Sequence, residues 1–385
     1  MIDRRATLLL SAGHLFTDLN QGALPALLPF FVAEYQLSYQ QAAGLVFAAT
    51  FASSVVQPLF GRYADRFSAA WLMPVGILAA GVGLGLTGLT ANYWVMALVL
   101  MVSGLGVAAF HPEAARSMNA AAGERKATGM SFFSIGGTAG FAVGPLLTTA
   151  LMLAFGVRGA LLLALPALGM AAVLFAQLRV LPRLQLSRPH GSGGEGSGAT
   201  DLWRHFGLLS ASIILRSVLF FGFNTFLPLY WIDSLGQSQA AGGTILSLWL
   251  GSGVIGSLVG GRLADRYGAR RIGMLTSLAL VPLVVVFVLV PQPWLAAVLV
   301  TLMSILLAAP GSGLMVLGQG YLPNHVGVAS GVTIGLSVSV GGATAPVLGW
   351  LADQFGIPAA LSSLTVIPLL IALMLWILPR LRPTT

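Results

Sequence analysis

Cysteine is absent from the 385-residue chain, and charged residues make up only 8% of it. The first absence excludes disulfides, thiol catalysis and cysteine metal sites. The second excludes an ordinary soluble domain, because a water-facing surface brings the charged fraction to roughly 25%. Hydrophobic residues reach 57%, and the mean hydropathy is +0.89. With 48 glycines and 20 prolines, the chain is expected to be a polytopic protein of packed helices in a lipid bilayer.

Long apolar runs of the length that a membrane-spanning helix needs recur along the whole chain. Polar residues interrupt the first run and no small-residue cleavage site follows it, so we expect an uncleaved helix rather than a signal peptide. The sequence therefore predicts an all-α integral membrane protein with twelve transmembrane helices. They are expected near residues 6–33, 39–61, 70–90, 93–117, 127–155, 158–181, 205–233, 239–262, 271–290, 293–319, 326–355 and 357–379.

The basic residues are distributed unevenly between the two sides of these helices. If successive helices cross in alternate directions, 17 of the 19 lysines and arginines fall on one side, and only Arg158 and Arg216 do not. The positive-inside rule then places both termini and the linker in the cytoplasm of a multi-pass membrane protein. The positive net charge therefore reflects topology and does not indicate a nucleic-acid partner.

The chain consists of two similar halves joined by a linker. The stretch "RPHGSGGEGSGAT" (188–200) is rich in glycine and serine, which is typical of a flexible linker. "GRYADRF" at 61–67 returns as "GRLADRY" at 261–267, which is 200 residues later. We therefore predict an N-terminal six-helix bundle (1–181), a cytoplasmic linker (182–204) and a C-terminal six-helix bundle (205–385). Transporters that rock one half against the other have this organisation.

The repeated loops resemble the signature loop of the major facilitator superfamily. The resemblance implies two pseudo-symmetric six-helix bundles that transport a small molecule by alternating access. Acidic side chains beside helix ends can accept bonds from backbone N–H groups and arginines, and such contacts would latch one conformation. The alternative is that these loops are charged cytoplasmic anchors. The predicted gating residues are Asp65, Arg66, Asp265, Arg266 and Arg270.

Two further stretches narrow the resemblance. "GFAVGPLL" (140–147) is similar to the helix 5 motif of drug/proton antiporters, with Gly140, Gly144 and Pro145 as its packing residues. "GHLFTDLNQG" (13–22) and "FHPEAAR" (110–116) resemble the fosmidomycin-resistance branch. This resemblance implies proton-coupled export of fosmidomycin-like or other small organic drugs. A proton gradient would supply the energy, with no cofactor, and the protein would work as a monomer.

Polar residues inside the first helix are the main functional candidates. His14, Asp18 and Gln21 follow the i, i+4, i+7 spacing of one helical face. A carboxylate in hydrocarbon costs several kcal/mol unless it is paired, hydrated or protonated. We therefore predict that this face borders a water-accessible cavity, with Asp18 as the proton-coupling group and Asn20 and Gln21 near the substrate. The structural alternative is a buried aspartate that is hydrogen-bonded to neighbouring helices.

The fourth and seventh helices supply the remaining candidates. His111 can change charge near neutral pH, and Pro112 disturbs the turn before it. Glu113 joins His14 and His111 as a proton-coupling candidate, although Glu113 and Arg116 have the spacing of a simple ion pair. An arginine in an apolar run needs a counter-ion. For Arg216 of the seventh helix we expect this counter-ion to be Asp18 or an acidic substrate. The substrate-binding candidates on these two helices are Arg116, Arg216 and Asn224.

Other functions fit the sequence less well. An enzyme is not expected, because the chain has no nucleophile–base pair at recognisable spacing, no zinc motif and no phosphate loop. A proton-coupled importer of a small organic anion is the main alternative to an exporter. A metal or metal-chelate carrier is a further alternative, since two histidines and two carboxylates can coordinate an ion, although no resident metal is predicted.

Overall fold

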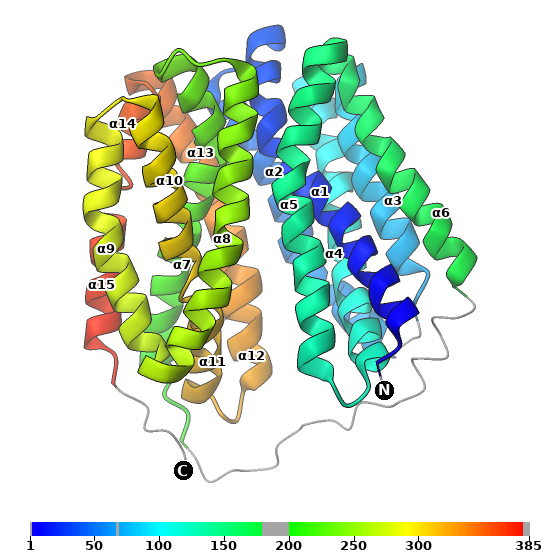
Figure 1. Ribbon diagram of the computed structural model, residues 1–385, viewed down its shortest axis with the longest axis vertical. Coiled ribbons are helices and arrows are strands. Elements are labelled where there is room, and N and C mark those ends of the chain that lie inside the picture. The colour runs from blue at the N-terminus through cyan, green and yellow to red at the C-terminus, as the bar shows by residue number, and fades with distance from the viewer. Residues whose placement is uncertain (1, 67–68, 179–199, 380–385) are drawn as a thin grey trace. The chain divides into compact units, whose positions relative to one another are not determined.

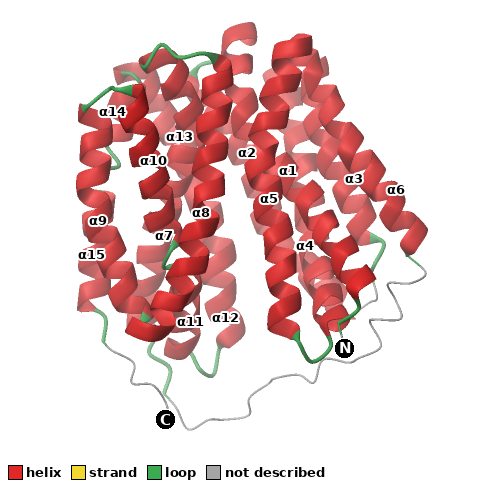
Figure 2. Cartoon of the chain, viewed as in Figure 1, coloured by secondary structure: helices red, strands yellow, loops and turns green. Residues whose placement is uncertain are grey.

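The structure is a computed structural model that describes residues 2–66, 69–178 and 200–379. The side chains of residues 58, 61–66, 127, 326–327 and 334–335 also lie outside the description. Every regular element in the described part is helical, and Figure 2 shows helices joined by short loops with no strand among them. Most of the predicted linker, 182–204, falls outside the described residues, so the predicted bundle boundaries stay predictions.

Contacts between Cα atoms group the described helices into two compact units. The first unit contains six α-helices, and residues 239–247 of α8 are grouped with it. Its elements, which run from blue to green in Figure 1, are α1 (Arg4–Tyr35), α2 (Tyr39–Arg66), α3 (Leu72–Gly85), α4 (Tyr93–Ala122), α5 (Lys126–Phe155) and α6 (Ala164–Gln177), with 3-10 segments at Leu86–Leu89 and Gly156–Leu163.

The second unit contains the remaining helices and is interrupted more often by short irregular turns. Its helices are α7 (Trp203–Leu229), most of α8 (Gln239–Tyr267), α9 (Ala269–Leu289), α10 (Pro293–Ala308), α11 (Gly311–Tyr321), α12 (Val326–Ser330), α13 (Ser337–Phe355), α14 (Ile357–Ser362) and α15 (Ile367–Ile377). The π-helical segment Tyr230–Ser234 extends α7, and a second one, Gly331–Leu336, joins α12 to α13.

Polar side chains cap the starts of two helices of the first unit. The Asp3 carboxylate accepts from the Ala6 N–H at 3.0 Å and begins α1. The Asn92 side chain accepts from two backbone N–H groups of the first turn of α4. Such caps satisfy donors that have no partner inside the helix. Gly268, with φ of 89°, lets the chain turn from α8 into α9, a conformation that residues with a Cβ rarely adopt.

The two units pair corresponding helices in the same way. In the first unit α1 packs along α5, with α4 beside both and α3 between α4 and α6. In the second unit α7 packs along α13, and α9 packs against α10 and α15. A buried apolar cluster packs α1, α3, α4 and α6 of the first unit together, and it includes Leu10, Met73, Ile77, Phe110 and Leu174. The equivalent pairs α1–α5 and α7–α13 reflect the duplication in the sequence.

The number and type of the predicted helices are confirmed. Nine segments of the described residues are long and apolar enough to cross a membrane. One of them, 128–177, has 50 residues and contains both α5 and α6. The helices α1 and α2, of 32 and 28 residues, are also long enough but carry more polar side chains. Within the described residues this gives twelve helical segments of membrane-crossing length, and most begin and end within a few residues of the predicted limits.

Candidate functional site

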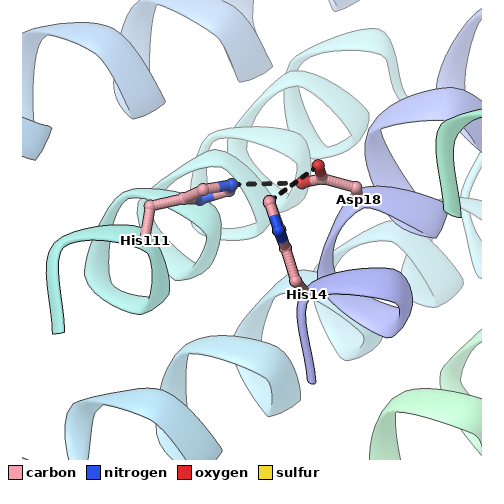
Figure 3. Close-up of side chains that lie close together, drawn as sticks. All are labelled: His14, Asp18 and His111. Carbon is pink, nitrogen blue, oxygen red and sulfur yellow. Dashed lines mark ion pairs between the residues drawn. The ribbon is translucent and has the colours of Figure 1, made fainter. Parts of the chain in front are cut away.

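Three ionisable side chains from two helices of the first unit meet inside the bundle. Figure 3 shows His14 and Asp18 of α1 and His111 of α4 reaching toward one another. His14 Nε2 lies 3.1 Å from Asp18 Oδ2, and His111 Nε2 lies 3.2 Å from Asp18 Oδ1. The Asp18 side chain is 6% exposed, whereas those of His14 and His111 are 12% and 21% exposed. Two imidazoles therefore surround a carboxylate that is almost removed from solvent.

The other nitrogen of each imidazole fixes the orientation of its ring. His14 Nδ1 lies 2.8 Å from the Phe133 carbonyl oxygen, and His111 Nδ1 lies 2.8 Å from the Val107 carbonyl oxygen. A carbonyl oxygen only accepts, so both Nδ1 atoms carry hydrogen. The His14 ring also stacks on the Phe133 ring, with centroids 4.0 Å apart. Both Nε2 atoms are thereby directed at Asp18.

The other polar residues predicted on α1 have separate partners. Gln21 Nε2 donates to Asp18 Oδ1 at 2.8 Å, which adds a neutral donor to the carboxylate. Asn20 donates to the Phe16 and Thr17 carbonyls, and its buried Oδ1 has no partner within the described part of the chain. The spacing on α1 therefore brings His14, Asp18 and Gln21 into one connected group, with Asn20 outside it.

Glu113 and Arg116 of α4 bind each other. The Arg116 guanidinium donates to both carboxylate oxygens of Glu113 at 3.0 Å, and the Glu113 side chain is fully buried. A buried carboxylate needs such a partner. The spacing of Glu113 and Arg116 in the sequence was also that of a simple ion pair, and the structure contains this pair. A role for either residue in transport stays a prediction.

Glycines of α5 allow α1 to approach closely at the site. A Cβ on Gly140 would overlap the Leu15 carbonyl oxygen, and one on Gly144 would lie 2.5 Å from the Leu19 carbonyl oxygen. One on Gly137 would lie 2.6 Å from both Asp18 Oδ2 and His14 Nε2.

Sequence reasoning missed both Gly137 and Phe133 as parts of this site. The sequence gives only one weak signal for them. Gly136, Gly140 and Gly144 are spaced four residues apart, and this series of small residues extends toward Phe133. Pro145 follows Gly144 inside α5.

The candidates of the second unit lie on α7. Arg216 donates from a terminal guanidinium nitrogen to the Leu307 carbonyl oxygen, while its buried Nε has no partner among the residues described. Asn224 is 4% exposed, and its Oδ1 likewise has no partner in that part of the chain. The predicted pairing of Arg216 with Asp18 stays a prediction, because the two residues belong to different units.

The duplicated loops follow α2 and α8. Asp65 and Arg66 end α2, and their side chains lie outside the described residues. Asp265 is exposed, and Arg266 lies over the ring of its neighbour Tyr267. Arg270 donates to the Leu375 and Trp376 carbonyls at the end of α15. Arg270 thus ties the start of α9 to a helix end within the second unit, as a cation near unpaired carbonyls is expected to do.

An ion pair of the second unit joins the segment before α7 to the loop after α11. His325 Nδ1 lies 2.7 Å from Asp201 Oδ2, and the Asn324 N–H donates to Asp201 Oδ1 at 3.1 Å. Burial raises the pKa of Asp201, but the hydrogen bonds from Asn324 and His325 outweigh it, so the pKa is lowered from its ordinary value of 3.8.

Comparison with known proteins identifies the family. The family model of the Major Facilitator Superfamily matches residues 10–346, which is most of the chain. The chain belongs to the major facilitator superfamily. This superfamily member is therefore a multi-pass membrane transporter.

Individual relatives cover nearly the whole transporter. The "Fosmidomycin resistance protein" of Escherichia coli (strain K12) is 27% identical over 94% of this chain and 89% of its own length. The "Uncharacterized MFS-type transporter YfnC" of Bacillus subtilis (strain 168) is 29% identical over 93% and 88%. The crystal structure of a bacterial homologue of the human lysosomal transporter Spinster has a TM-score of 0.83, with 14% identity over 98% of both chains. The last likeness concerns the fold alone.

Proposed function

We propose that this transporter is a proton-coupled exporter of small organic drugs of the fosmidomycin kind. It would work as a monomer by alternating access in a bacterial inner membrane, with both termini in the cytoplasm. The observation that carries the proposal is the contact of Asp18 with two imidazoles inside a membrane-spanning bundle. Intramembrane ionisable groups of this kind mark ion and proton pathways.

The contacts of the cluster supply a mechanism for holding and releasing protons. Both Nδ1 hydrogens are committed to backbone carbonyls, so each short contact between an Nε2 atom and Asp18 needs a further hydrogen. Loss of one of these protons leaves a lone pair facing a carboxylate oxygen, and that contact must open. Because His14 is on α1 and His111 is on α4, proton release would change how these helices are held together.

Arg216 and Asn224 are the proposed contacts for the substrate. Arg216 keeps its charge in proteins and has an unused donor at its buried Nε. An anionic group on the substrate, such as the phosphonate of fosmidomycin, would supply the missing acceptor. Asn20, Gln21 and Arg116 complete the proposed substrate set, although two of them already bind acidic neighbours.

Proton-driven efflux tests the proposal directly. Inverted membrane vesicles would be given a pH gradient, and uptake of fosmidomycin into them would be compared with equilibrium binding to the purified protein. Asp18→Asn should abolish gradient-driven transport while binding persists, because an amide cannot release a proton at this site. Glu124→Gln, in an exposed loop, is the matched carboxylate control and should transport normally.

Two results would contradict the proposal. Uphill transport by Asp18→Asn at the wild-type rate would show that Asp18 is not the coupling carboxylate. Gradient-driven movement in the opposite direction would favour the alternative, a proton-coupled importer of a small organic anion.

A further inference from the structure

The arrangement of His14, Asp18 and His111 is also that of a metal-ligand set. One donor atom from each residue can be chosen so that all three lie within 4.8 Å of one another. Two ligands bound to Zn²⁺ at about 2.0–2.1 Å in tetrahedral geometry are about 3.3 Å apart. The two histidine-to-carboxylate distances of 3.1 and 3.2 Å are close to that separation.

The surroundings of the two imidazoles supply independent support. A histidine that binds a metal usually donates its other ring N–H to a carboxylate or a backbone carbonyl, which fixes the ring and its tautomer. His14 does so with Phe133, and His111 does so with Val107. In both rings Nε2 is left as the ligand atom, directed at Asp18. The partial exposure of both histidine side chains gives an ion access.

We propose that His14, Asp18 and His111 bind one divalent transition-metal ion, of the class of Zn²⁺ or Co²⁺. Two imidazole nitrogens and one carboxylate oxygen suit this class better than Mg²⁺ or Ca²⁺, which prefer oxygen ligands. With three protein ligands, the ion keeps a fourth position for water. Nothing in the arrangement requires the ion for folding, because hydrogen bonds join the same atoms without it.

Metal binding exchanges protons for the ion. When both imidazoles are protonated, two Nε2–H bonds break, two Nε2–metal bonds form, and Asp18 supplies a third ligand oxygen. Two protons leave, while both Nδ1–H groups stay on their carbonyls. The net charge of the site is unchanged, because a dication replaces two protons. The ion would occupy the lone pairs that proton exchange needs and so would block coupling, a consequence that rests on the proposed function.

The ionisable groups around the cluster are few. On α4, Glu113 and Arg116 face each other and offset each other's charge. The helices α3 and α6 contain no ionisable residue, and α5 contains only Lys126 at its start. The other charged residues of α1 and α2 lie near the helix ends: Arg4, Arg5 and Glu34 on α1, and Arg62, Asp65 and Arg66 on α2. The pH dependence of metal binding is therefore expected to come from the two histidines and Asp18. The apparent affinity should rise about 100-fold per pH unit where two protons are displaced, and about 10-fold where one is.

Cobalt titration of the purified full-length protein tests this site without any transport measurement. We expect one Co²⁺ per chain, detected by its visible absorption, with affinity rising between about pH 6 and about pH 8. His111→Ala and Asp18→Asn should each lose this binding, whereas His325→Ala, a histidine outside the cluster, should keep it. Binding that survives in His111→Ala, or no binding by the wild type, would overturn the proposal.

A cysteine variant guards against loss of binding through misfolding. His111→Cys should bind Co²⁺ and produce a thiolate-to-cobalt charge-transfer band, and the band can come only from position 111 because the natural chain has no cysteine. A folded variant with Co²⁺ bound but without that band would refute His111 as a ligand position. Failure of the transport test on Asp18→Asn would leave these binding results untouched, so the two proposals can fail separately.

Discussion

Gly137 of α5 offers a selective way to disturb the cluster without removing any of its groups. In Gly137→Ala the new Cβ would lie 2.6 Å from both Asp18 Oδ2 and His14 Nε2, whereas ordinary van der Waals contact begins at 3.4 Å. Both side chains must therefore move away from the new methyl group, each by about 0.8 Å. If both atoms move straight away from the methyl group to that distance, their 3.1 Å contact lengthens to about 4 Å, which is beyond hydrogen-bond distance.

The energetic cost depends on what the new methyl group meets. Overpacking a well-packed interior costs about 1–3 kcal/mol in free energy of unfolding. Gly137→Ala should lie near the lower limit, because it meets side chains that can shift. Gly140→Ala should lie near the upper limit, because it meets the Leu15 carbonyl and the Leu19 nitrogen, which are backbone. Gly169→Ala on α6 meets nothing within 4 Å and should be neutral.

The assay combines thermal unfolding in detergent with proton-driven fosmidomycin efflux and Co²⁺ binding. We expect Gly137→Ala to lose most efflux and to bind Co²⁺ more weakly while it keeps most of its stability, whereas Gly169→Ala behaves as the wild type. Wild-type efflux by Gly137→Ala would refute the reasoning, and so would a loss of stability as large as that of Gly140→Ala.

Three further predictions concern topology, the duplicated loop and pH. Cysteines introduced singly at Asn92 and Ser192 should respond oppositely to an impermeant thiol reagent added to intact cells, with only Asn92→Cys labelled, and labelling at position 192 alone would reverse the proposed topology. Asp265→Asn should slow fosmidomycin efflux while membrane expression stays normal. Unchanged efflux kinetics would show that this loop is a charged anchor without a gating role. Because the pKa of Asp201 is lowered from 3.8, its stabilising bond to His325 should be fully present above that value and lost as the pH falls below it. The difference in unfolding temperature between wild type and Asp201→Asn should therefore shrink on acidification, and a difference that grows instead would contradict the assigned sign.

Much of the architecture was predictable from the sequence, because hydrocarbon leaves the backbone few options. Apolar runs of about 20 residues must form helices in a membrane, and the predicted run at 326–355 coincides with the span from α12 to the end of α13. Asn92 and Gly268 mark helix limits through chemistry that is local to the chain. The repeated loops at 61–67 and 261–267 likewise predicted two matching sets of helices.

The candidate site was only partly predictable. His14, Asp18 and Gln21 share one face of α1 because helical periodicity places them there, and this needed no tertiary information. That His111 directs Nε2 at Asp18, while Phe133 and Val107 hold the two rings, depends on how α1, α4 and α5 pack. Periodicity gives the face of each helix but neither the register nor the distance between helices. Those follow from contacts such as Gly140 against Leu15. The sequence alone therefore determined which ionisable groups enter the membrane, and tertiary packing decided which of them lie within hydrogen-bond distance of one another.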